Sequence, residues 1–167
     1  MTAAGVDEEI ERKFLVNTAE IKKLLASDIV SKNYTELDQG YLVNGPTALR
    51  LRIAFPPKGP HTGELTIKGP GAVKHYEKNV ELPEDVARAL QRACPGVISK
   101  HRFRYGRWEI DRFINVNDPD THERLWMAEI ELKSEEEAFE HPSWLGREVT
   151  LDLRYTNARL SEHIVKD

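Results

Sequence analysis

Residues 8–16 read EEIERKFLV, a stretch with charged side chains at every second position from 9 to 13 and apolar ones at positions 10 and 14. Glu9, Glu11 and Lys13 fall on one side of the alternation, and Ile10 falls on the other. Successive side chains of a β-strand point to opposite faces of its sheet. The stretch therefore predicts a strand with one charged face and one apolar face.

The same alternation recurs in later segments, such as LRLRI at residues 49–53 and AEIEL at residues 128–132. An ordinary half-exposed sheet also alternates, and it remains the alternative for any single strand. Arginines two residues apart can hold an anion between them, and carboxylates at that spacing can converge on one divalent cation. Taken together, the segments favour a closed barrel whose charged face lines a central cavity.

Turn sequences rich in glycine and proline separate these segments. Helices are expected to be few and short, beginning at Asn17, Pro83 and Ser134 and covering residues 157–164. We therefore predict the α+β class, as a closed eight-stranded antiparallel β-barrel with a few short outer helices. The expected strands lie near residues 8–16, 35–43, 47–55, 62–69, 73–82, 97–106, 107–115 and 123–133, with a weaker one near 28–33.

The length of 167 residues predicts a single domain over residues 1–167 with a core over about residues 8–160. The formal net charge of −4 argues against a general nucleic-acid-binding protein. No apolar run approaches the roughly 18 residues of a membrane-spanning helix, and residues 1–14 lack the pattern of a secretory signal. The single cysteine, Cys94, fits a reducing compartment, so we expect a cytoplasmic protein with no membrane or nucleic-acid partner.

Residues 9–13, EIERK, resemble the ExExK motif of the CYTH superfamily, the triphosphate tunnel metalloenzymes. The resemblance covers about residues 8–160. Two later segments, WLGREVT at 144–150 and RYTN at 154–157, look like the short bacterial inorganic tripolyphosphatases. Between EIERK and WLGREVT, the resemblance rests on six further segments: QGYL (39–42), LRLR (49–52), LTIKG (65–69), KHR (100–102), WEID (108–111) and AEIEL (128–132).

The resemblance implies a tunnel-shaped barrel, Mg²⁺ or Mn²⁺ as cofactor, and hydrolysis of inorganic tripolyphosphate to pyrophosphate and orthophosphate. Thiamine triphosphatase, nucleoside triphosphatase and class IV adenylate cyclase are alternatives within the family. The cyclases resemble one another in a His-Phe motif just before ExExK, where this chain has Val6-Asp7-Glu8. A module that binds a triphosphate or polyphosphate without hydrolysing it is the alternative outside the enzyme class.

The resemblance also implies roles for individual side chains. Glu77 is expected to position the attacking water, and Tyr41 and Lys100 form a candidate base pair whose alternative is a tunnel-lining tyrosine beside a phosphate-binding lysine. The expected ligands of triphosphate oxygens are Lys13, Arg50, Arg52, Lys68, Lys100 and Arg102, and the expected metal ligands are Glu9, Glu11, Asp111, Glu129 and Glu131. The expected partner is a small-molecule triphosphate, and an apolar outer sheet covered by few helices favours a homodimer.

One segment departs from the family. The fifth strand usually reads Arg-x-Glu-x-Glu, but here His75 stands in place of the arginine and Asn79 in place of the second carboxylate. A neutral histidine would weaken phosphate binding, and Asn79 cannot supply a charged ligand. Lys74 could replace the arginine through a register shift. The six histidines lack the spacing of paired metal ligands, so a zinc site built from histidines is not expected.

Overall fold

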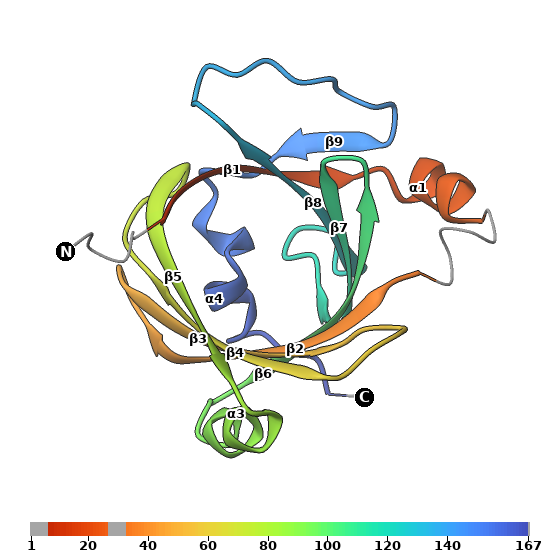
Figure 1. Ribbon diagram of the computed structural model, residues 1–167. Coiled ribbons are helices and arrows are strands. Elements are labelled where there is room, and N and C mark those ends of the chain that lie inside the picture. The colour runs from red at the N-terminus through yellow and green to blue at the C-terminus, as the bar shows by residue number, and fades with distance from the viewer. Residues whose placement is uncertain (1–6, 27–32, 167) are drawn as a thin grey trace.

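The computed structural model describes residues 7–26 and 33–166, whose strands form one antiparallel sheet closed into a barrel (Figure 1). The strand order is β5-β4-β3-β2-β6-β7-β8-β1-β9, and a further pairing of β5 with β1 closes the barrel. The strands are β1 (Asp7–Val16), β2 (Thr35–Asn44), β3 (Ala48–Phe55), β4 (Thr62–Lys68), β5 (Lys74–Leu82), β6 (Val97–Tyr105), β7 (Trp108–Asn117), β8 (Arg124–Leu132) and β9 (Leu145–Glu148). The predicted eight-stranded antiparallel barrel is confirmed.

Strand β1 closes the barrel by pairing with three other strands. One edge pairs with β8 from Ile10 to Leu15. The other edge pairs with β5 over residues 7–10 and with β9 at Phe14 and Val16. The ninth strand therefore continues the edge of β1 beyond the point where β5 diverges. The sequence analysis did not predict β9.

The helices are few and short, as expected: α1 (Thr18–Leu25), α3 (Glu84–Gln91), the 3₁₀ helix η1 (Leu153–Tyr155) and α4 (Asn157–Leu160). The prediction that a helix begins at Ser134 is wrong, because the Glu137 carboxylate instead accepts from the Lys133 amide and pairs with Arg107. The expected helix over 157–164 ends at Leu160, and the weak strand near 28–33 falls almost wholly outside the described residues. None of the described helices is long and apolar enough to cross a membrane.

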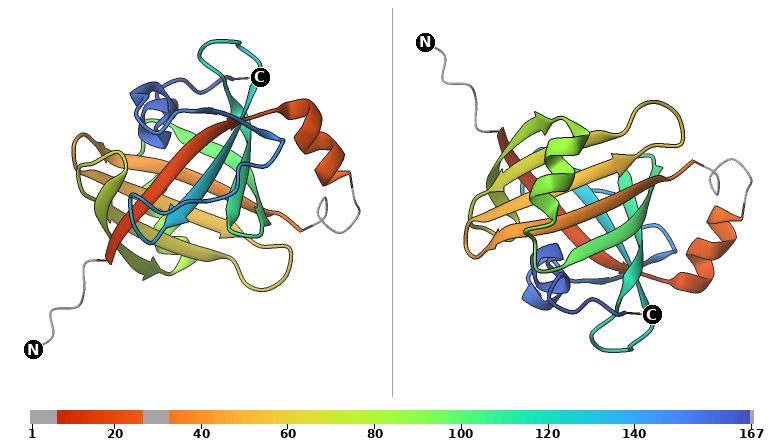
Figure 2. Two further views of the ribbon diagram at one scale, coloured as in Figure 1. Left: turned by 90° about the horizontal axis from the view of Figure 1, so that it is seen from above. Right: turned by 90° about the horizontal axis from the view of Figure 1, so that it is seen from below.

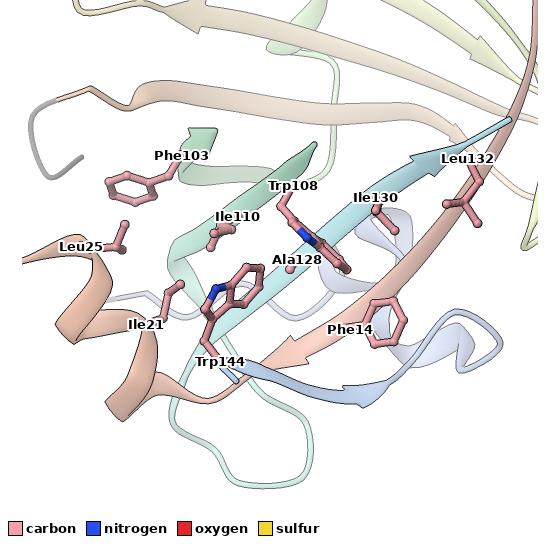
Figure 3. Close-up of a cluster of buried hydrophobic side chains, with 10 residues drawn as sticks. All are labelled: Phe14, Ile21, Leu25, Phe103, Trp108, Ile110, Ala128, Ile130, Leu132 and Trp144. Carbon is pink, nitrogen blue, oxygen red and sulfur yellow. The ribbon is translucent and has the colours of Figure 1, made fainter. Parts of the chain in front are cut away.

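The outer face of β1, β6, β7 and β8 carries the larger apolar core (Figure 3). Ile21 and Leu25 of α1 and Trp144 cover this face, and the Trp108 and Trp144 rings meet edge to face at 5.4 Å. Helix α1 begins where the Asn17 side chain accepts a hydrogen bond from the Glu20 amide, as its capping sequence predicts. Because the apolar face points outward into this core, the charged face of the same strands points into the barrel.

A second apolar core closes one end of the barrel interior. Phe113, Leu125 and Met127 point inward beyond the charged residues of their strands and pack against Tyr155 of η1 and Leu160 of α4. Viewed along the barrel axis, α4 lies within the outline of the sheet (Figure 1). The charged interior is therefore limited at this end by the segment that follows β9.

Helix α3 lies across the outer face of β2, β3 and β4 (Figure 2). Its Ala87 is fully buried, and Gly63 of β4 lies beneath it. A Cβ at residue 63 would stand 2.6 Å from Ala87 Cβ and 2.8 Å from the Leu82 carbonyl oxygen. The absence of a side chain at Gly63 thus permits the close approach of α3 to the sheet.

We expect Gly63→Ala to lower the free energy of unfolding by about 1–3 kcal/mol, since overpacking a close helix–sheet contact forces the backbone apart. Urea denaturation followed by circular dichroism measures this loss. Gly45→Ala is the matched control, because a Cβ there meets no atom closer than 3.8 Å. Equal stability of the two variants would contradict this account of the α3 contact.

Candidate active site

The inner face of the barrel encloses a strongly charged cavity of about 560 Å³. Strand register brings residues distant in sequence together there, since Glu129 of β8 pairs with Lys13 of β1 on one side and with Glu109 of β7 on the other. The cavity lining includes Glu9, Glu11, Arg50, Arg52, Glu64, Lys68, Glu77, Asn79, Arg102, Arg104, Arg107, Glu109, Glu129, Glu131, Lys133 and Asn157.

A second cavity of about 500 Å³ reaches the interior from the end covered by α4. Lys13, Tyr41 and His75 line it, together with residues of α4. Glu11 and Lys68 line both cavities, and Lys68 Nζ donates a hydrogen bond to Glu11 Oε1 at 3.4 Å. This ion pair therefore stands at the boundary between the two halves of the charged interior.

Three acidic residues near that boundary have different pKa values. Burial, and next the charge of Glu77, raise the pKa of Glu9 to about 8. Burial opposes the ionisation of Glu11 and Glu77, but neighbouring polar and charged groups outweigh it. Lys13 and Lys68 lower the pKa of Glu11, and His75, Lys68 and Arg50 lower that of Glu77 to about 2. At neutral pH the site thus holds two ionised carboxylates beside one that retains its proton.

Glu129 lies on β8, the strand next to β1, with its carboxylate oxygens 3.9 Å from Lys13 Nζ and 3.9 Å from Arg102 Nη2. Glu129 Oε1 and Glu77 Oε2 are buried, and neither has a hydrogen-bond partner among the described residues. Buried carboxylate oxygens without partners are costly and suit a bound cation. The oxygen-rich donor set of this interior therefore fits a divalent metal. Glu131 lines the same cavity but is exposed.

Three of the predicted phosphate ligands already have polar partners. Arg50 Nη2 donates to Thr66 Oγ1 at 2.9 Å and lies 3.9 Å from Glu77 Oε1. Arg52 Nη2 donates to Gln39 Oε1 at 3.1 Å. Lys68 Nζ lies 3.6 Å from Glu77 Oε2. These contacts hold the cationic groups along the cavity wall.

Lys100, Arg102 and Asp111 form a buried ion cluster. Lys100 Nζ lies 2.6 Å from Asp111 Oδ2, and Arg102 donates to both Asp111 oxygens at 2.7 and 2.8 Å. Both carboxylate oxygens of Asp111 are thus engaged by Lys100 and Arg102. Burial, together with the charge of Arg102, lowers the pKa of Lys100 to about 8, although Asp111 opposes this.

The structure does not bring Tyr41 and Lys100 into hydrogen-bond contact within the described residues. Lys100 Nζ instead donates to Asn157 Oδ1 at 3.2 Å. In the β2–β6 ladder Lys100 pairs with Leu37, four residues before Tyr41. This arrangement favours the alternative in which Tyr41 lines the tunnel beside Lys13.

The unusual fifth strand directs Lys74 outward, where it pairs with Glu8 at 3.2 Å. The alternative in which Lys74 replaces the arginine through a register shift is therefore not favoured. His75 points inward and is buried, and Asn79 accepts a hydrogen bond from Thr66 at 2.7 Å. The side chains of Glu9, His75 and Glu77 offer ligand atoms that all lie within 4.8 Å of one another. The sequence analysis did not place His75 in a metal site.

Other interior residues were assigned no role from the sequence. Gln39 is fully buried and orients Arg52, Thr66 orients Arg50, and Asn157 reaches Lys100 from α4. Strand alternation could have placed Gln39 and Thr66 on the inner face. No local pattern reveals that α4 enters the end of the barrel.

The sequence profile of the CYTH domain matches residues 7–162. An inorganic triphosphatase from Acetivibrio thermocellus is 34% identical, over 96% of this chain and 97% of that protein. An inorganic triphosphatase from Nitrosomonas europaea is 32% identical, over 92% and 96%. The crystal structure of an inorganic triphosphatase is similar with a TM-score of 0.58 and 29% identity, over 95% of this chain and 97% of that one. A conserved hypothetical protein from Pyrococcus furiosus, with a TM-score of 0.52 and 20% identity over 77% and 80%, shares the fold.

Proposed function

This chain belongs to the CYTH domain family, and on that basis we propose that it hydrolyses inorganic tripolyphosphate to pyrophosphate and orthophosphate with a divalent metal. The observation that carries the proposal is the barrel interior, where cationic side chains and carboxylates with unpartnered buried oxygens share one cavity. A phosphoanhydride substrate requires both positive charge around its oxygens and a cation that bridges them.

The cationic groups that would bind the triphosphate come from several strands. Arg50, Arg52, Lys68 and Arg102 line the larger cavity, and Lys13 lines the cavity beside it. Arginine donates two parallel hydrogen bonds to phosphate oxygens, which fixes the orientation of the chain of phosphates. Lys100 is fully buried within its ion cluster. We therefore assign Lys100 and Asp111 to the positioning of Arg102.

The residues that would hold the metal are Glu9, Glu11, Glu77, Glu129 and Glu131, all of which line the larger cavity. When bound, Mg²⁺ or Mn²⁺ supplies charge neutralisation at the phosphate oxygens and lowers the pKa of a bound water. Glu77, whose pKa is held at about 2, is ionised at neutral pH. Glu77 and Glu129 would orient the attacking water through their carboxylate oxygens, with orthophosphate as one product and pyrophosphate as the other.

The decisive assay measures orthophosphate release from tripolyphosphate, thiamine triphosphate and ATP, each with Mg²⁺, Mn²⁺ or EDTA. We expect fast release from tripolyphosphate that EDTA abolishes. Preference for thiamine triphosphate or ATP would contradict the assigned substrate. Thermal stabilisation by tripolyphosphate without release from any substrate would identify the chain as a binding module.

The raised pKa of Glu9 predicts a pH dependence of metal binding. Between pH 4.5 and about 8, the folded carboxyl keeps a proton that the unfolded chain has released, so the metal-free fold loses stability as the pH rises across this window. A cation must displace that proton, so its affinity should rise up to about pH 8. Free Mn²⁺, measured by electron paramagnetic resonance during titrations at pH 6.5, 7.5 and 8.5, tests this. If the Mn²⁺ affinity of the wild type does not change with pH, Glu9 does not couple metal binding to pH. The same conclusion follows if Mn²⁺ affinity depends on pH equally in the wild type and in Glu9→Gln.

A further inference from the structure

His75 is an unusual residue for the interior of this barrel. Its side chain is 3% exposed, and neither ring nitrogen has a hydrogen-bond partner among the described residues. A buried imidazole normally satisfies at least one nitrogen, because leaving polar atoms without partners away from water is costly. The surroundings of His75 are therefore incomplete without a further group.

The orientation of His75 shows where that group would lie. His75 pairs with Glu9 across the β1–β5 ladder, and Glu77 follows two residues later on the same inward face. His75 Nε2 lies 3.5 Å from Glu77 Oε2 and 3.9 Å from Glu9 Oε2. Ligands bound to a metal at about 2.0–2.2 Å stand roughly 3–3.5 Å from one another, so small side-chain movements would complete a site.

The neighbouring cation, Lys68, does not hydrogen-bond the Glu77 oxygen that faces His75. Lys68 Nζ lies 3.6 Å from Glu77 Oε2, but that oxygen has no hydrogen-bond partner among the described residues. Glu9 adds a second carboxylate, and no arginine occupies the position of His75. The three side chains therefore offer one nitrogen and two oxygen ligands that lie within 4.8 Å of one another.

We propose that His75, Glu9 and Glu77 form a mixed imidazole–carboxylate site that prefers transition-metal dications such as Co²⁺ and Zn²⁺ to Mg²⁺. Mg²⁺ favours oxygen ligands, whereas imidazole nitrogen favours first-row transition metals. The inference deepens the proposed function, on which it rests for the catalytic use of the metal. The departure from the family pattern at residue 75 then sets metal selectivity.

The direct test uses substrate-free protein. Pulsed electron paramagnetic resonance of bound Mn²⁺ should show coupling to an imidazole nitrogen in the wild type, and Co²⁺ and Zn²⁺ should bind at least about tenfold more tightly than Mg²⁺. His75→Gln should lose the nitrogen coupling and about 10–100-fold of Co²⁺ affinity. His61→Gln is the control, because His61 is exposed and contacts Glu84 outside the barrel.

His75→Arg provides a second variant in case glutamine is not tolerated, and it should lose the preference for transition metals. Absence of nitrogen coupling in the wild type would overturn the inference, as would Co²⁺ affinity that is equal in the wild type and either variant. These outcomes are separable from the proposed function. EDTA-sensitive tripolyphosphate hydrolysis without nitrogen coupling would refute only the site, whereas nitrogen coupling without hydrolysis would refute only the activity.

Discussion

Glu129→Gln is expected to reduce tripolyphosphate hydrolysis by about 10³-fold, or roughly 4 kcal/mol of transition-state stabilisation, while the barrel remains folded. The substitution keeps the size of the side chain but removes its charge. Glu129 Oε1 is buried without a hydrogen-bond partner among the described residues, so its negative charge is available for a metal in the cavity. Steady-state orthophosphate release at saturating Mg²⁺ measures the loss.

The fold should tolerate this change because the cations near Glu129 have other partners. Lys13 Nζ lies 3.5 Å from Glu11, and Arg102 binds Asp111 and Glu109. Thermal unfolding and circular dichroism should therefore resemble those of the wild type. Glu8→Gln is the matched control, because Glu8 lies on the outer face of β1 and pairs with Lys74. Normal turnover in Glu129→Gln would remove this residue from the metal site.

Asp111→Ala is expected to destabilise the protein by about 3–5 kcal/mol, because it leaves two buried cations without their shared carboxylate. Lys100 is fully buried and Arg102 is 9% exposed, so water cannot readily replace the lost partner. Arg102 keeps Glu109, but Lys100 keeps only Asn157 among the contacts described above. Urea denaturation at pH 7 measures the change in the free energy of unfolding.

Glu84→Ala is the control for this prediction, because it also removes one carboxylate from an ion pair. Glu84 binds Arg88 at 2.7 Å on the surface of α3, where solvent screens the charges. We expect little change in stability for this variant. A similar loss in both variants would show that the burial of the Asp111 cluster does not set its importance.

Strand alternation explains why much of the site could be predicted from the sequence. The side-chain direction of Glu9, Glu11 and Lys13 depends only on the two-residue period of β1, which is visible in the local sequence. The apolar residues Ile10 and Phe14 on the other face of the strand indicate which face the outer core covers. The inward direction of the charged residues was therefore accessible without knowledge of the strand order.

The partners of these residues depend on contacts between distant segments. Asp111 meets Arg102 because β6 and β7 pair in that register, and this pairing engages a carboxylate that was expected to bind metal. Lys100 meets Asn157 because α4 enters the barrel end. Ser134 carries a local helix-start signal, but Arg107 and the Lys133 amide compete for Glu137 and keep the segment in a turn. Such competition is not visible in a local pattern.

Strand β1 pairs along both of its edges, and this affects when the proposed metal site forms during folding. Residues 7–10 pair with 74–77, and residues 10–15 pair with 127–132, so the partners are at least 64 and 112 residues apart in the chain. Contacts between such distant residues have a high entropic cost of loop closure and form slowly. Glu9 and Glu11 are carried by this strand, so they reach the other carboxylates only when the barrel closes. A chain in which β1 has not docked would therefore lack Glu9 and Glu11 at the proposed metal site, so we expect metal affinity to depend on closure of the barrel.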